Sequence, residues 1–129
     1  MISLSGLNPQ QRKACEKVDG AVLILAGAGS GKTRTLTYRM AHMIDNLEIP
    51  ASSLLGVTFT NKAAKEMKER VETLLGKRKS RGLTLCTFHS LGVRILKEEI
   101  TKLGYHKNFS IYDSSDQLAI IREALKNYK

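Results

Sequence analysis

A short apolar run that leads into three closely spaced glycines constrains the fold of this chain more than any other feature of its sequence. Residues 21–26 read Ala-Val-Leu-Ile-Leu-Ala without alternation, and Gly27, Gly29 and Gly31 follow. An unbroken apolar run of this length is typical of a strand that is covered on both faces of a parallel sheet. We therefore expect residues 21–26 to form a central strand of an α/β fold, with the glycines turning the chain into a helix.

The glycines belong to a phosphate-loop pattern. Residues 26–33 match G-x-x-x-x-G-K-[ST], except that Ala26 replaces the first glycine. In such a loop, backbone N–H groups turn inward onto phosphate oxygens, and the following helix adds the positive end of its dipole. We expect Lys32 to contact the β- and γ-phosphates and the Thr33 hydroxyl to bind Mg²⁺, so that these two carry the chemistry. The residues predicted to hold a nucleoside triphosphate are Gly27, Ala28, Gly29, Ser30, Gly31, Lys32 and Thr33.

Helical and strand patterns alternate along the rest of the chain. Two further strands are expected at residues 54–59 and 83–87. Caps and breakers predict helices at residues 9–18 and 32–45, between Asn61 and Gly76, before Gly104, and from Ser114 onward. A helix followed by three strand–helix units indicates a parallel sheet with flanking helices, because crossovers of this kind are right-handed.

The balance of charge favours polyanionic partners. The 129 residues include 21 Lys and Arg against 12 Asp and Glu, a formal net charge of +9. Alternating signs at residues 65–72 are typical of a solvated helix face, whereas residues 77–81 read as a basic surface loop that attracts phosphates. No apolar stretch is long enough for a membrane span, and Cys15 and Cys86 lack metal-type spacing, so we expect a cytoplasmic chain without membrane contact.

Four segments together resemble one protein family. They are L-N-P-Q-Q at 7–11, the loop at 26–33, T-F-T-N-K-A-A at 58–64 and T-F-H-S-L at 87–91. In this order they resemble the amino-terminal half of superfamily 1 DNA helicases of the UvrD, Rep and PcrA type, and F-S-I-Y-D at 109–113 extends the resemblance. It implies a P-loop NTPase (RecA-like) parallel sheet, incomplete here, with 1–104 as part of the ATP-binding motor domain and 105–129 as the start of a helical insertion.

The resemblance also assigns site residues. It places the amide of Gln11 at the adenine edge and the guanidinium of Arg34 on the adenine face. It assigns contacts to single-stranded DNA to Thr58, Phe59, Thr60, Asn61, Thr87 and His89. Among these, Phe59 is expected to stack on a base. Without the resemblance, Phe59 reads as a core residue, His89 as a structural histidine, and Gln11 and Arg34 as surface residues. Phe88 is expected in the core.

The implied function is ATP-dependent helicase activity, with 3′–5′ translocation on single-stranded DNA and a second motor domain as partner. The sequence contains no apolar strand that ends in Asp-Glu, which such a motor needs for Mg²⁺ and water activation. We therefore expect the front part of a longer motor, which binds ATP but hydrolyses little alone. Two other interpretations stay open: a non-catalytic ATP-responsive DNA-binding module, and a small P-loop kinase with an acceptor site and an arginine-bearing lid.

Overall fold

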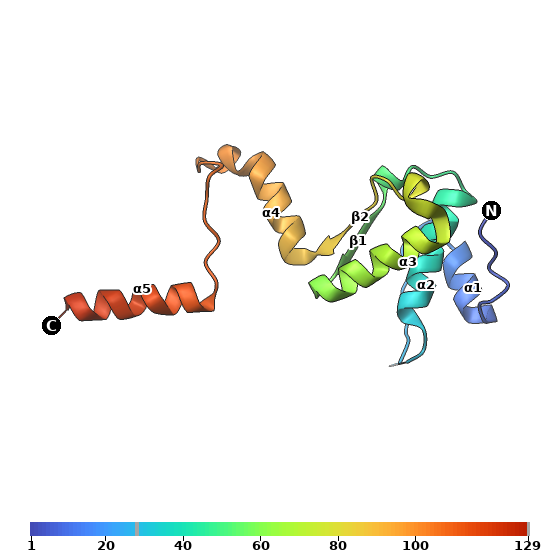
Figure 1. Cartoon of the computed structure of the whole chain (residues 1–129), viewed down its shortest axis with the longest axis horizontal. Coiled ribbons are helices and arrows are strands. Elements are labelled where there is room, and N and C mark those ends of the chain that lie inside the picture. The colour runs from blue at the N-terminus through green and yellow to red at the C-terminus, as the bar shows by residue number, and fades with distance from the viewer. Residues whose placement is uncertain (28, 129) are drawn as a thin grey trace. The chain divides into compact units, whose positions relative to one another are not determined.

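The computed structural model describes residues 1–27 and 29–128, which divide into two compact units, Met1–Leu91 and Gly92–Lys129. Both units consist mainly of helices, and the described strands lie in the first unit (Figure 1). The elements in chain order are α1 (Pro9–Glu16), α2 (Lys32–Asp45), a 3-10 turn η1 (Ala51–Ser53), β1 (Leu55–Thr58), α3 (Asn61–Lys79), β2 (Thr84–Thr87), α4 (Phe88–Glu99), a second 3-10 turn η2 (Ile100–Leu103) and α5 (Ser114–Asn127). Every predicted helix is present.

The sheet in the described residues consists of β1 and β2, which run parallel. Their register places Leu55 opposite Thr84 and Thr58 opposite Thr87. The connecting helix α3 packs against both strands, so this part of the chain is a β–α–β unit, as the pattern at residues 54–87 predicted. Because the strands run in the same direction, their carboxyl ends at Thr58 and Thr87 meet at one edge of the sheet.

The structure contradicts the predicted central strand at residues 21–26. These residues form no strand, and Leu23 and Leu25 are 83% and 86% exposed. A strand needs a neighbour for its backbone N–H and C=O groups, and within residues 1–27 and 29–128 the strands β1 and β2 pair with each other alone. The segment has the composition of a buried strand, but the described part of the chain supplies neither a pairing strand nor a cover for it.

Helix α1 begins with a capping box. The Asn8 side chain accepts a hydrogen bond from the Gln11 backbone, and the Gln11 side chain accepts one from the Asn8 backbone. The helix ends at Glu16, two residues before the predicted Val18. Its carbonyl end is tied to α2, because the guanidinium of Arg39 donates to the backbone oxygens of Ala14 and Lys17.

The near-helical spacing of Leu36, Met40, Met43 and Ile44 predicts an apolar stripe on this helix, but the buried face of α2 differs from it. Leu36 is exposed, whereas Thr35, Thr37 and Ala41 are buried. The two threonine hydroxyls are satisfied by donating to carbonyls one turn back, Gly31 for Thr35 and Thr33 for Thr37. Short side chains allow close packing, and α2 packs against both α1 and α3.

Helix α3 starts one residue away from the expected position and continues beyond its predicted end. The residue that caps the helix is Thr60 and not the expected Asn61. The Thr60 hydroxyl accepts a hydrogen bond from the Ala63 backbone N–H at 3.1 Å. Gly76 interrupts the helix with a φ of 76°, a conformation that glycine adopts readily, but one further turn follows. The predicted basic loop is therefore partly helical, since residues 77–79 belong to that turn.

One cation of this basic stretch is engaged internally. Lys79 pairs with Asp45 at the end of α2, and the amino group of Met1 lies 3.0 Å from the other carboxylate oxygen. The Asp45 side chain is 5% exposed. The hydrogen bond from Lys79, followed by that from the Met1 amino group, holds the pKa of the Asp45 carboxyl below its ordinary value. The neighbouring Asn46 exchanges two hydrogen bonds with the Ile2 backbone, so the amino-terminal segment is fixed to α2.

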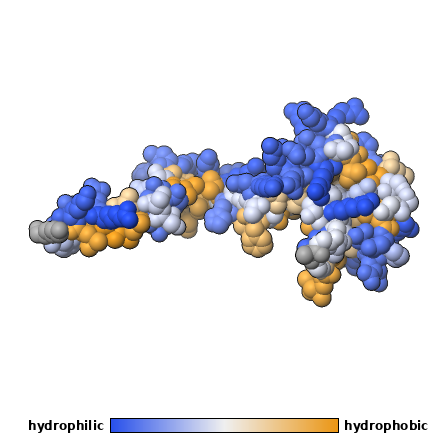
Figure 2. All heavy atoms as spheres, turned by 60° about the horizontal axis from the view of Figure 1, so that its bottom comes forward, coloured by the Kyte–Doolittle hydropathy of each residue, from blue (hydrophilic) through white to orange (hydrophobic). Residues whose placement is uncertain are grey.

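Helix α4 ends at Glu99 and is followed directly by η2, which stops before Gly104, the predicted helix terminator. Helix α5 is capped by Asp113, one residue before the expected Ser114, and its capping box uses Asp116. Hydrophobic residues gather along one side of α5 and hydrophilic residues along the other (Figure 2). Among the residues the structure describes, no helix is both long and apolar enough to cross a membrane.

Candidate nucleotide site and nucleic-acid edge

The phosphate-loop sequence folds back on itself at the start of α2. Lys32 is the first residue of the helix, and its Nζ donates to the backbone oxygens of Ala26 at 2.8 Å and Gly27 at 2.9 Å. The Ser30 hydroxyl donates to the same Gly27 oxygen at 2.7 Å. The ammonium group therefore lies within the loop, next to the amino end of a helix, where an anion is favoured. Ala28, also predicted to contact phosphate, lies outside the described residues.

Gln11 connects α1 to this loop. Its Nε2 donates to the Ser30 backbone oxygen at 3.1 Å, while its Oε1 completes the α1 capping box. Gly31, which caps α2 with a φ of 83°, lies so close that a Cβ there would stand 2.8 Å from this amide nitrogen. The structure thus places Gln11 beside the predicted loop. A cavity of about 250 Å³ opens here, lined by Asn8, Gln10, Gln11, Ala14, Ile24, Leu25, Ala26, Gly27, Ser30, Lys32 and Thr35.

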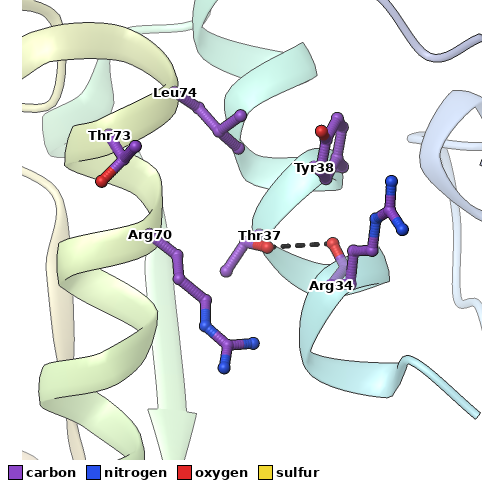
Figure 3. Close-up of a pocket in the computed structure, with 6 residues that line it drawn as sticks. All are labelled: Arg34, Thr37, Tyr38, Arg70, Thr73 and Leu74. Carbon is purple, nitrogen blue, oxygen red and sulfur yellow. Dashed lines mark hydrogen bonds between the residues drawn. The ribbon is translucent and has the colours of Figure 1, made fainter. Parts of the chain in front are cut away.

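Arg34 lines a neighbouring cavity of about 270 Å³ between α2 and α3 (Figure 3). Its guanidinium carbon lies 5.6 Å from the centre of the Tyr38 ring, a cation–π arrangement, and Nη2 donates to the Gly6 oxygen at 3.0 Å. Arg70 reaches toward this space from α3, and the Thr37 hydroxyl donates to the Arg34 carbonyl at 2.9 Å. The structure therefore separates Arg34 from the lining of the Gln11 cavity.

Thr33 lies in the first turn of α2 and is half-buried. A hydroxyl oxygen at this position suits Mg²⁺, which binds hard oxygen ligands. The other Mg²⁺ ligands at such sites are usually water molecules and phosphate oxygens. Among residues 1–27 and 29–128, no group of three or more His, Cys, Asp or Glu side chains is placed to hold a metal ion. That the Thr33 hydroxyl binds Mg²⁺ at the loop stays a prediction.

The second predicted site lies at the carboxyl ends of β1 and β2. Phe59 directly follows β1 and is 88% exposed, so its ring is available for stacking and does not belong to the core. Thr58 is half-buried, and Asn61 is exposed in the first turn of α3. Thr60 is exposed too, although its hydroxyl is occupied by the α3 cap.

At the end of β2, the structure exposes His89 and Phe88 and buries Thr87. Thr87 is buried, and its hydroxyl accepts from the Ser90 backbone at 3.1 Å and donates to the Ser90 hydroxyl at 3.0 Å. Its side chain therefore fixes the start of α4, while His89 is exposed. The prediction that Phe88 belongs to the core is wrong, because its ring is 55% exposed. The Phe59 and Phe88 ring centres lie 5.5 Å apart, with the ring planes tilted by 48°.

Sequence reasoning missed Tyr38 and Phe88. Tyr38 stands four residues after Arg34 on the same helix, a spacing that places two side chains on one face and could have suggested their contact. Phe88 stands at the same position after β2 as Phe59 does after β1, and both follow a threonine. This parallel between the two strand ends was the available signal for Phe88.

These features define a mixed α/β protein with a phosphate-loop sequence at the start of one helix and exposed aromatic rings at the ends of two parallel strands. The chain belongs to the UvrD/REP helicase N-terminal domain family, whose pattern matches residues 7–129. Membership in this family removes the small P-loop kinase from consideration. It agrees with the resemblance of the segments at residues 7–11, 26–33, 58–64 and 87–91.

Curated relatives share about half of their residues with this chain where they align. The ATP-dependent DNA helicase Rep of Escherichia coli (strain K12) is 53% identical over 117 residues, 91% of this chain and 17% of the relative. The ATP-dependent DNA helicase PcrA of Bacillus subtilis (strain 168) is 50% identical over 123 residues, 95% of this chain. PcrA of Staphylococcus aureus (strain Mu50) is 45% identical over 124 residues. The chain spans 16–17% of the length of these relatives.

Proposed function

We propose that this chain is the nucleotide-binding front of an ATP-dependent DNA helicase motor. The observation that carries the proposal is the position of the Lys32 ammonium, inside a glycine-rich turn and at the amino end of α2. Cationic charge, glycine backbone and a helix amino terminus converge there, and a triphosphate is the ligand that uses all three. The relatives named ATP-dependent DNA helicases support the same ligand.

Binding of ATP exchanges one set of hydrogen bonds for a stronger set. Lys32 leaves the neutral carbonyls of Ala26 and Gly27 and contacts phosphate oxygens, and charge-assisted bonds of this kind are roughly twice as strong as neutral ones. Gln11 offers its amide to the adenine edge. Arg34 lines the neighbouring cavity, and it exchanges its contacts with Gly6 and Tyr38 for the adenine face when the nucleotide binds. The Thr33 hydroxyl holds Mg²⁺, which neutralises phosphate charge when it is bound.

The edge at Phe59 is proposed to hold single-stranded DNA. An exposed ring supplies a stacking surface for a base, and neighbouring polar groups at Thr58, Thr60 and Asn61 supply contacts to phosphate and sugar. His89 contributes from the end of β2, and Thr87 acts through the start of α4. In the intact, cytoplasmic protein, a second motor domain would close on ATP and drive 3′–5′ translocation.

The proposed fold of the complete motor is a RecA-like parallel sheet that includes residues 21–26. The exposed side chains of Leu23 and Leu25 support this, because exposed apolar strand sequence is normally covered by sheet neighbours. Further strands of the motor would pair with this segment. Residues 1–104 then form part of the ATP-binding domain and residues 105–129 begin a helical subdomain.

By itself, the chain is proposed to bind MgATP and to hydrolyse it slowly. Its sequence contains the loop but no apolar strand that ends in Asp-Glu, the pair that the chemistry needs to activate water. In isolation it therefore works as an ATP-responsive DNA-binding module.

Fluorescence anisotropy with a labelled dT oligonucleotide tests the DNA edge. We expect the 129-residue chain to bind the oligonucleotide, and Phe59→Ala to weaken binding about 5- to 150-fold while the salt dependence changes little. Tyr128→Ala, at an equally exposed ring at the end of α5, serves as the control and keeps the affinity. Equal affinities in wild type and Phe59→Ala would contradict the proposed edge. Robust DNA-stimulated ATPase turnover would contradict slow hydrolysis by the chain alone.

A further inference from the structure

We propose that Phe88 and Phe59 form a bent two-ring platform on which two successive bases of single-stranded nucleic acid stack, unstacked from each other. This inference deepens the proposed DNA edge and depends on it. It adds Phe88 as a base-stacking residue and commits the edge to a particular conformation of the strand.

The backbone places the two rings side by side. Thr58 and Thr87 are opposite each other in the parallel register, so the next residues, Phe59 and Phe88, leave the sheet from adjacent strand ends. Neighbouring strands lie about 4.7–4.9 Å apart, which accounts for the 5.5 Å between the ring centres. The Thr60 cap of α3 and the Thr87 hydrogen bonds at the start of α4 hold both backbone segments in place.

The two rings are exposed amid polar groups. Large aromatic side chains normally bury most of their surface, yet these rings are 88% and 55% exposed. Asn61, Lys62 and His89 are exposed and stand within three positions of Phe59 or Phe88 in the sequence, and the chain carries a net charge of +9. Aromatic faces next to cationic and hydrogen-bonding groups are the pattern that single strands recognise, because bases stack while phosphates meet positive charge.

The ring geometry determines how bases can bind. A base inserted between two rings needs their centres about 7 Å apart, twice the contact distance of roughly 3.5 Å. At 5.5 Å the gap is too narrow, so bases must stack on the outward faces. Because the planes are tilted by 48°, two bases that each lie flat on one ring cannot stack on each other. The platform therefore favours strands that unstack easily, such as oligo-dT over oligo-dA.

The first test measures the affinity of the 129-residue chain for labelled oligo-dT and oligo-dA of equal length. We expect tighter binding of oligo-dT, and a loss of about 5- to 150-fold in Phe88→Ala together with a smaller preference for dT. Phe88→Leu keeps an apolar side chain without a π face, so we expect it to bind nearly as weakly as Phe88→Ala. Wild-type affinity in Phe88→Leu would show that Phe88 only supports Phe59, and would overturn the platform.

A second measurement reports the contact directly. The chain contains no tryptophan, so Phe88→Trp introduces a single indole at the platform. We expect this variant to bind oligo-dT within about threefold of wild type, with its emission quenched as a base stacks on the indole. If saturating oligo-dT left the tryptophan emission unchanged, the inference would be wrong. The exposed rings would then suit contact with a protein partner.

The outcomes separate this inference from the proposed function. If Phe59→Ala weakens oligo-dT binding while Phe88→Ala and Phe88→Leu bind as wild type does, the platform is wrong and the DNA edge stands. If Phe59→Ala also binds as wild type does, the DNA edge itself is wrong. Tyr128→Ala is the matched control in both cases, because its ring is exposed and lies at the end of α5.

Discussion

The Nζ atom of Lys32 donates a hydrogen bond to the backbone oxygen of Ala26 across 2.8 Å, and so closes the turn that joins residues 21–26 to α2. The same atom lies 2.9 Å from the Gly27 oxygen. An ammonium group held by two neutral carbonyls is ready to exchange them for an anion, because a phosphate oxygen forms a stronger, charge-assisted bond. This relationship is the basis of the proposal that the turn binds the phosphates of a nucleotide.

Gly31 is the first position at which a small change should impair that site. Its φ of 83° disfavours any residue with a Cβ, and a Cβ would meet the Gln11 amide at 2.8 Å. We expect Gly31→Ala to lower the free energy of unfolding by about 1–2 kcal/mol and to weaken ATP binding, because Gln11 must leave Ser30. Urea unfolding and titration with a fluorescent ATP analogue measure the two effects.

The control for this substitution is Gly92→Ala. Gly92 lies within α4, where an added Cβ meets nothing within 4 Å. We expect this variant to be more stable by about 0.5–1 kcal/mol, since alanine favours helix, and to bind the ATP analogue as wild type does. If Gly31→Ala matched Gly92→Ala in both stability and ATP-analogue binding, the prediction that position 31 requires glycine would be wrong.

Gln11 carries two functions that substitution can separate. Its Oε1 completes the α1 capping box, and its Nε2 donates to the loop at Ser30. Glutamate also forms capping boxes, so Gln11→Glu keeps the α1 cap but loses the exposed bond to Ser30, and we expect its unfolding temperature to fall only slightly. Because it has no donor for the adenine edge, it should lose the preference for ATP over GTP in competition titrations. An unchanged ATP preference would contradict the adenine role.

Asp45 should make stability depend on pH. Hydrogen bonds from Lys79 and from the Met1 amino group lower the pKa of its carboxyl in the folded state. A depressed folded pKa adds stability that is complete above the unfolded pKa, about 3.9, and is lost as the pH falls through the folded value. We expect Asp45→Asn to be less stable than wild type at pH 7, with the difference closing below about pH 4.

Urea unfolding between pH 3 and pH 7 measures this difference. Asp19→Asn is the control, because Asp19 is exposed in the turn after α1 and forms none of the described ion pairs. We expect the Asp19 variant to have the stability of wild type throughout this pH range. If the difference in the free energy of unfolding between Asp45→Asn and wild type stayed constant across the pH range, the charge of the carboxylate would not be what stabilises the fold.

Local chemistry made the helices predictable from the sequence. The helix start after Asn8 and the stop at Gly104 depend on residues within one turn, and both are confirmed. The caps of α3 and α5 were displaced by one residue, because Thr60 stands next to Asn61 and Asp113 next to Ser114, and each of the four can cap a helix.

Tertiary context set the limit of prediction. Whether residues 21–26 pair as a strand depends on partners distant in sequence, and the apolar composition of the segment carries no information about them. The same holds for Phe59 and Phe88, since a phenylalanine after a strand suits either a core or an exposed edge. Their exposure became visible only with the β1–β2 register.

The most direct test of the account is the affinity of the chain for MgATP, measured calorimetrically in wild type and in Lys32→Ala. We predict a single site in wild type and at least tenfold weaker binding in Lys32→Ala, because the ammonium that contacts the phosphates is removed. Lys97→Ala, at an exposed lysine of α4, should bind MgATP as wild type does. Undetectable binding by wild type, or equal binding by Lys32→Ala, would contradict the proposed nucleotide site.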